Sequence, residues 1–142
     1  MTGKPELILG KATAHIGTPR YAVDIEVGHH RLVADEPKAL GGQDAGPPPF
    51  GLLLSALGAC TAATLKMYAE RKDWPLEALD VDLRYLRSEP DDDRIERSLR
   101  IKGPLDQSQR ARLADVAERT PVTLAIKNGV AIHTEIEESE AA

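Results

Sequence analysis

The sequence predicts a single α+β domain in which an antiparallel sheet packs on a long, buried central helix. Three observations lead to this prediction. Residues 6–34 read as two or three strands, with apolar residues at alternate places over 21–27. Residues 50–72 are almost all helix formers, and residues 79–101 alternate apolar and polar side chains on both sides of an acidic turn. Because 142 residues is near the usual size of one domain, residues 1–142 are expected to fold together.

The first part of the chain predicts two or three strands, over residues 6–16, 21–27 and 30–34. Gly17-Thr18-Pro19 and Gly28-His29 supply the turns between them. Residues 35–49 then contain four of the ten prolines and three glycines, which neither a helix nor a sheet tolerates well. This stretch is expected to be an ordered crossing loop or a mobile lid.

The helix predicted over residues 50–72 has an unusually apolar first half. Its stripe of residues at spacings of three and four consists of Leu53, Leu57, Cys60, Thr64 and Met67. The first half, FGLLLSALGACTAAT, is apolar or small on nearly every side, which indicates burial on several sides. The second half is amphipathic and ends on basic residues shortly before Pro75.

The last part of the chain predicts a hairpin, a helix and a final strand. Strands around residues 79–85 and 95–101 flank the acidic run Glu89–Asp93, which reads as a solvated hairpin tip. Asp106 and Gln109 form a capping-box pattern that predicts a helix ending near Thr120-Pro121. A short apolar stretch over 122–126, a turn, and a strand over 130–136 follow, and residues 137–142 are expected to be a frayed tail.

Composition and charge exclude several classes of function. A net charge of −5 and a pI near 5.4 argue against nucleic acid as the main partner, because phosphate binding needs clustered Lys and Arg. The sequence has no uninterrupted run of about 18 apolar residues and no signal pattern at its start, so no membrane association is expected. The single cysteine cannot form an internal disulfide, and together these features predict a cytoplasmic protein.

Residues 41–83, GGQDAGPPPFGLLLSALGACTAATLKMYAERKDWPLEALDVDL, resemble the most recognisable stretch of the OsmC/Ohr family of osmotically inducible and organic-hydroperoxide-resistance proteins. Further similar segments, in the same order, are GHHRLVADEP at 28–37, the acidic hairpin, GPLDQSQRARL at 103–113 and PVTL at 121–124. The resemblance implies an intertwined homodimer in which the long helices of two subunits lie between two sheets. A partner subunit would also cover a helix that is apolar on every side.

The resemblance implies a reactive thiol at Cys60. In active members this cysteine attacks a peroxide, assisted by an arginine and a glutamate, and a second cysteine then forms a disulfide with it. Relatives commonly have Cys-Pro-Val where this chain has Thr120 followed by Pro and Val, and the places of the acid are taken by Phe50 and Gly51. Turnover of Cys60 would therefore require an external thiol reductant.

The arginine of the site has two candidates. Arg20, at the start of the second predicted strand, lies roughly where relatives carry the basic residue, and Arg31 is its competitor. Without the resemblance, both arginines read as exposed strand residues and Cys60 as a small buried core residue. The four histidines lack ligand spacing, so neither a metal site nor a cofactor is predicted.

Two functions are consistent with the sequence. The first is a thiol-dependent peroxidase acting on organic hydroperoxides, with Cys60 as nucleophile and Arg20 stabilising the thiolate. Its substrate pocket is expected to be lined by Phe50, Leu53, Leu54 and Leu57. The alternative is a non-catalytic homodimer that binds a small apolar ligand at the subunit interface; a purely structural dimer is a third, weaker reading.

Overall fold

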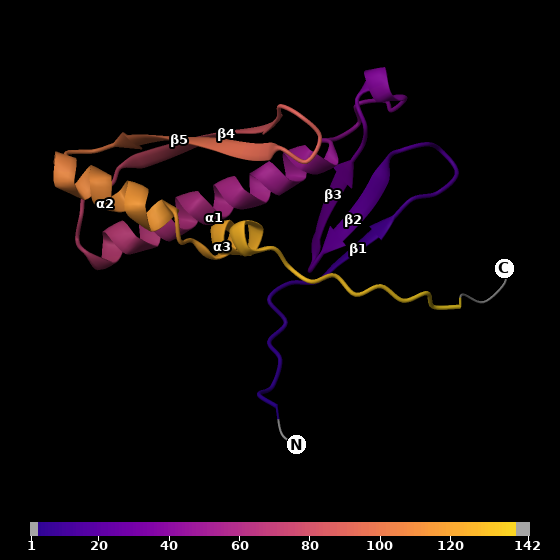
Figure 1. Cartoon of the computed structure of the whole chain (residues 1–142), viewed down its shortest axis with the longest axis horizontal. Helices are drawn as coiled ribbons and strands as arrows, with labels where there is room; N and C mark the ends of the chain where they lie inside the picture. Colours follow the sequence, from indigo (N-terminus) through magenta and orange to yellow (C-terminus); the bar gives the residue numbers. More distant parts are fainter. Residues whose placement is uncertain (1–2, 139–142) are drawn as a thin grey trace. The chain divides into compact units, whose positions relative to one another are not determined.

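The computed structural model describes residues 3–138, and the chain divides into two compact units, residues 1–55 and residues 56–142. Each unit is described by itself. The helix α1 (Pro49–Arg71) begins in the first unit and continues into the second (Figure 1). The architecture is α+β, as predicted, and the described residues form two antiparallel sheets and three α-helices. That residues 1–142 form one domain stays a prediction.

The first unit contains a three-stranded antiparallel sheet of β1 (Ala12–His15), β2 (Val23–Val27) and β3 (His30–Ala34), in that order (Figure 1). Val27 pairs with His30, which leaves a two-residue turn between β2 and β3. Gly28 has a φ of 61°, the positive value that such hairpin turns require at their first central residue. The prediction of this turn and of the strand over 30–34 is confirmed.

The proline- and glycine-rich segment after β3 is an ordered loop, fixed by one buried carboxylate. Asp35 is 2% exposed and accepts backbone N–H bonds from Glu36 at 2.7 Å and from Gln43 and Ala45 at 3.1 Å. The N–H of Ala45, with those of the other two residues, holds the pKa of this carboxyl below its usual range. One turn of 3₁₀ helix, η1 (Lys38–Leu40), lies within the loop.

The helix α1 matches the predicted helix to within a residue at each end. Proline at its first position fits, because that residue would have no intrahelical partner for an N–H. Within one chain, however, α1 is buried along a single stripe, formed by Leu57, Thr61, Leu65 and Ala69. The predicted stripe was wrong in part: Leu57 is buried, whereas Leu53 and Met67 are exposed.

By length and composition α1 could span a membrane, since its best 18-residue window has a mean hydropathy of 1.5. The core helix of a soluble protein passes the same test. Only 17% of that window is buried inside the chain, so most of this apolar surface is left without cover from the described residues.

The second unit packs helices on a long hairpin. The hairpin consists of β4 (Ala78–Arg87) and β5 (Asp93–Lys102), paired antiparallel, and is followed by α2 (Gln107–Ala117) and α3 (Pro121–Asn128). The core joins α1 to α2 and to the connecting loops, and its members are Leu65, Ala69, Leu76, Leu105, Leu113 and Ala117. The capping box of Asp106 and Gln109 at the start of α2 is confirmed.

Two segments predicted as strands, over 6–11 and 130–136, are not strands, and the apolar stretch over 122–126 belongs to a helix. Residues 121–126 are helical, because Thr120 is the N-cap of α3 and Pro121 its first residue. Residues 130–136 and 6–11 have no strand assignment, and the first strand is confined to Ala12–His15. A strand requires a neighbouring backbone to pair with, and no described segment supplies one here.

The terminal segments nevertheless expose the apolar side chains that suggested strands. Leu7, Leu9, Val130, Ile132 and Ile136 are between 70% and 94% exposed. Residues 139–142 of the predicted frayed tail lie outside the described residues.

Candidate thiol site

Cys60 lies in the middle of α1, within the second unit, and is neither fully buried nor fully exposed. Its sulfur accepts a hydrogen bond from the backbone N–H of Val122, with an N–Sγ distance of 3.4 Å. The hydroxyl of Thr64, one turn further along α1, lies 3.9 Å from the same sulfur. The thiol is therefore in contact with a second helix, far away in the sequence.

The contact comes from the N-terminal turn of α3. Thr120 is the N-cap and Pro121, the first residue, has no N–H, so Val122 carries the first amide donor inside this helix. The N-terminus of a helix carries partial positive charge, and amide donors there stabilise an anion. This end of α3 is thus oriented to stabilise negative charge on the Cys60 sulfur.

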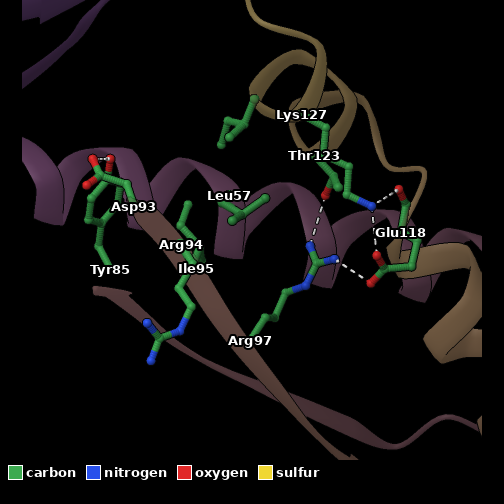
Figure 2. A pocket seen from close by; sticks show the side chains of 10 residues that line it. Leu57, Tyr85, Asp93, Arg94, Ile95, Arg97, Glu118, Thr123 and Lys127 are labelled. Atoms are coloured by element: carbon green, nitrogen blue, oxygen red, sulfur yellow. Dashed lines mark hydrogen bonds and ion pairs between the residues drawn. The ribbon is translucent and has the colours of Figure 1, made fainter. Parts of the chain in front are cut away.

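A largely buried cation lies in the same region. Arg97 of β5 is only 12% exposed in its side chain. Its Nη1 donates to the hydroxyls of Thr61 (3.0 Å) and Thr123 (2.9 Å), and its Nη2 donates to the carbonyl of Ala117 (2.9 Å) and to Glu118 (3.3 Å). Figure 2 shows the guanidinium between Thr123 and Glu118. One side chain therefore ties β5 to α1, to α3 and to the end of α2.

Three buried threonines complete this arrangement. Thr61 and Thr120 are 0% exposed and Thr123 is 4% exposed. The hydroxyls of Thr120 and Thr123 lie 2.6 Å apart, Thr123 also lies 3.3 Å from the carbonyl of Ala117, and Thr61 donates to the carbonyl of Leu57 at 2.7 Å. We call Arg97 with Thr61, Thr120 and Thr123 the Arg97 cluster. Within residues 3–138 no buried side-chain nitrogen or oxygen lacks a hydrogen bond.

The Arg97 cluster borders a cavity of about 340 Å³ in the second unit (Figure 2). Its lining residues are Leu57, Tyr85, Asp93, Arg94, Ile95, Arg97, Glu118, Thr123, Ile126 and Lys127. The lining combines apolar side chains with charged ones. Cys60 is not among the lining residues, although Leu57 precedes it by three positions in α1.

Ion pairs fix several of the charged side chains that line the cavity. Lys127 donates to Glu118 at 2.7 Å and holds the pKa of that carboxyl below its usual range, with help from Arg97. Arg87 bonds Asp93 at 2.5 and 2.7 Å and, with the hydroxyl of Tyr85, lowers the pKa of Asp93 to about 2. The carboxylates of Glu118 and Asp93 remain ionised at neutral pH, so the cavity lining carries both negative and positive charges.

The residues of the predicted substrate pocket are only partly brought together. Leu57 lines the cavity of the second unit. Phe50 and Leu53 are 52% and 36% exposed, and with the half-buried Leu54 they belong to the first unit. A pocket formed by all four side chains stays a prediction.

The two predicted arginines both belong to the first unit. Arg20 is exposed and lies in the bend between β1 and β2, whereas Arg31 in β3 pairs with Glu26 at 3.1 Å and has an 84% exposed side chain. Neither assignment to the thiol site is tested by the structure. Thr120, which stands where relatives have the second cysteine, is two residues from the amide that contacts Cys60.

Arg97 was not among the residues predicted from the sequence, although a signal for it exists. In β5 the residues Ile95, Arg97, Leu99 and Ile101 alternate toward one face, and all four are half-buried. A charged residue in such an apolar stripe is rare unless it is paired. The interruption of the stripe by Arg97 is therefore in itself a sign of a buried polar contact.

A family model described as "OsmC-like protein" matches residues 41–135 of this sequence. That match covers more than half of the chain and includes Cys60, α3 and the Arg97 cluster. The chain belongs to the OsmC-like family. No curated protein in the comparison matches the sequence.

Solved structures of OsmC-like proteins share the fold. An OsmC-like protein from Mycoplasma pneumoniae has a TM-score of 0.71 at 22% identity, over 83% of this chain and 86% of its own. An organic hydroperoxide resistance protein OsmC from Legionella pneumophila has a TM-score of 0.65 at 22% identity, over 87% of this chain and 92% of its own. A candidate organic hydroperoxide resistance protein from Vibrio cholerae has captopril bound in one of its active sites. Its TM-score is 0.62 at 18% identity, over 87% of this chain and 89% of its own.

No group of three or more His, Cys, Asp or Glu side chains that could hold a metal ion occurs within residues 3–138. The predicted lack of a metal and of a cofactor stays a prediction.

Proposed function

We propose that this protein reduces organic hydroperoxides with Cys60 as the nucleophile. The observation that carries the proposal is the amide N–H of Val122 at 3.4 Å from the sulfur of a partly exposed cysteine. A thiolate is the reactive form of cysteine, and a donor at a helix N-terminus favours it. Membership of the OsmC-like family, some of whose solved members are named organic hydroperoxide resistance proteins, supports the same chemistry.

The proposed reaction has two stages. The Cys60 thiolate attacks the distal oxygen of ROOH and the O–O bond breaks, so that the sulfur is oxidised to a sulfenic acid. The alkoxide that leaves takes a proton and becomes ROH. An external thiol then condenses with the sulfenic acid and releases water, and a second external thiol reduces the mixed disulfide and restores Cys60. The external thiol is necessary because the chain contains no other cysteine.

Arg20 is proposed to stabilise the thiolate, with Arg31 as the competing candidate. Arg31 already pairs with Glu26, whereas Arg20 lies in a bend where its side chain is exposed. An apolar pocket formed with Phe50, Leu53, Leu54 and Leu57 would favour alkyl hydroperoxides over hydrogen peroxide, because burying an alkyl chain is favourable. A cytoplasmic location is proposed with this function, since a reducing compartment supplies small thiols.

A homodimer is proposed as the working form. Only 17% of the most apolar window of α1 is covered within the chain, and residues 7–9 and 130–136 expose large apolar side chains. Exposed apolar segments of this kind can form strands once a second backbone is available to pair with them. A second subunit would supply that partner and cover α1, and light scattering coupled to gel filtration would measure twice the 15.4 kDa chain mass.

The function is tested by following peroxide consumption with a small dithiol as reductant. The wild-type protein should consume cumene hydroperoxide catalytically, faster than hydrogen peroxide, and Cys60→Ser should be inactive. Thr64→Ser, which keeps a hydroxyl beside the sulfur, is the matched control and should remain active. Equal rates for wild type and Cys60→Ser would exclude the proposal.

The alternative function is non-catalytic binding of a small apolar ligand by the dimer. Two observations favour it. The cavity beside the Arg97 cluster is lined in part by the apolar residues Leu57, Ile95 and Ile126, and the chain lacks a second cysteine. Native mass spectrometry of protein purified from cells would detect a retained ligand. An empty protein that consumes peroxide rapidly would exclude this alternative.

A further inference from the structure

The amide contact to Cys60 depends on where the first turn of α3 lies. An isolated helix of eight residues has little intrinsic stability, so the position of α3 must be fixed by tertiary contacts. Thr123 lies in this first turn, next to Val122, and its hydroxyl accepts a hydrogen bond from Arg97 at 2.9 Å. The same Nη1 atom bonds Thr61, the residue that follows Cys60 in α1.

Arg97 thus joins the two segments that meet at the sulfur. It bonds α1 one residue after the thiol, and it bonds α3 one residue after the amide donor. Its second terminal nitrogen bonds the carbonyl of Ala117 at 2.9 Å, which fixes the chain leading into α3. The planar guanidinium can make these bonds together, whereas a lysine ammonium lacks the fork geometry.

We propose that Arg97 is a positioning residue for the Cys60 thiol: it holds the N-terminal turn of α3 so that the Val122 amide donates to the sulfur. Arg97 acts through the two threonines and not by touching substrate. This inference rests on the proposed function of Cys60 as a nucleophile. The family resemblance implies an arginine, an acid and two cysteines at the site, and Arg97 is not one of them.

The consequence for the thiol follows from the geometry. Without Arg97, the hydroxyls of Thr61 and Thr123 lose their common donor, and the first turn of α3 is free to shift. The Val122 amide then exchanges its hydrogen more easily, and the sulfur loses a donor that stabilises its charged form. Both effects can be measured without any peroxide.

The test compares Arg97→Met, Arg97→Lys and the control Arg94→Met. Arg94 lies on the same strand and lines the same cavity, but it bonds Glu96 and Ser88. The readouts are hydrogen exchange of the Val122 amide by NMR and the rate of Cys60 alkylation by iodoacetamide at pH 7. For Arg97→Met we expect exchange about tenfold faster and alkylation about tenfold slower, the effect of losing one to two net hydrogen bonds.

The lysine variant separates position from charge. If Arg97 acts by position, Arg97→Lys should resemble Arg97→Met, and Arg94→Met should change both rates by less than about twofold. Recovery of wild-type rates in Arg97→Lys would overturn the inference, because charge alone would then suffice. Wild-type rates in a destabilised Arg97→Met would overturn it too, since Arg97 would then only support the fold.

If Arg97→Met does not fold, Thr61→Val provides the same test with a side chain of matched shape. It removes the bond between Arg97 and α1, together with the bond that the Thr61 hydroxyl donates to the carbonyl of Leu57 within α1. We expect both rates to change about threefold in the same directions. Unchanged rates in Thr61→Val would contradict the inference. Alkylation requires no peroxide. If the wild-type protein fails to consume hydroperoxide, the proposed function is refuted, but the exchange and alkylation rates of the variants can still be compared.

Discussion

Replacing Thr123 with valine tests the energetic importance of the Arg97 cluster. Thr123 is 4% exposed, and its hydroxyl accepts from Arg97 and lies 2.6 Å from the hydroxyl of Thr120. Valine has nearly the same shape and a similar helix propensity, so the substitution removes the hydroxyl and little else. Any loss of stability therefore reports on the hydrogen bonds.

The magnitude follows from the groups that lose their partner. A hydrogen bond from a charged donor contributes about 1.5–3 kcal/mol, and a buried hydroxyl left unsatisfied costs about 1–3 kcal/mol. Thr120 is 0% exposed and its hydroxyl bonds Thr123, so it is left unsatisfied. Arg97 keeps Thr61 and Ala117, which limits its loss. We expect Thr123→Val to lower the free energy of unfolding by about 3–5 kcal/mol.

The assay is urea unfolding followed by the fluorescence of Trp74, at one fixed protein concentration because dimerisation shifts the apparent stability. Thr64→Val is the matched control: it is half-buried on α1, and its hydroxyl only approaches the Cys60 sulfur at 3.9 Å. It should change the free energy of unfolding by less than about 0.5 kcal/mol. A loss below about 1 kcal/mol in Thr123→Val would refute the reasoning.

Three further predictions concern other parts of the chain. Thr120→Cys should form a disulfide with Cys60 after one equivalent of peroxide, seen under denaturing conditions as a mass loss of about 2 Da; persistence of a reduced pair would show that position 120 cannot reach the sulfur. Leu65→Ala, at a 0% exposed core position, should cost about 2–5 kcal/mol in urea unfolding, and a cost near zero would argue against the described core. Because the pKa of Asp35 is lowered by backbone N–H donors, its ionised form stabilises the fold above the ordinary carboxyl pKa, and this contribution is lost as pH falls through the lowered value. The thermal midpoint of Asp35→Asn should lie below that of wild type at neutral pH and approach it in acid, and a constant difference would contradict this.

Local signals in the sequence were sufficient for most helices and paired strands. The limits of α1, the capping box before α2 and the turn at Gly28 each depend on nearby residues. The final segment was harder, because the apolar residues after Pro121 fit either a short strand or a helix. There the proline at the first helical position decided in favour of a helix.

The segments that failed as strands share one physical reason. Val130, Ile132 and Ile136 alternate as a strand would, but pairing depends on a second backbone that no described segment provides. Residues 7–9 are apolar in succession, and no described segment pairs with them either. An alternating pattern reports which side chains would share a face, and it does not report where the partner strand comes from.

The thiol site was predictable only in part. The position of Cys60 and the presence of Thr120 in place of a second cysteine could be read from the sequence, because both residues lie in recognisable motifs. The Arg97 cluster could not be assembled, since its threonines come from two helices far apart in the sequence. Arg97 itself interrupts an apolar stripe in β5, and this was the one local sign of its buried role.

The central claim is that the Cys60 sulfur is held ready to react with an organic hydroperoxide. Stopped-flow mixing of the reduced protein with cumene hydroperoxide, with thiol loss as the signal, measures that readiness directly. We expect a second-order rate constant at least about a hundredfold above that of free cysteine at pH 7, the size of effect that one well-placed group supplies. A rate equal to that of free cysteine would contradict it.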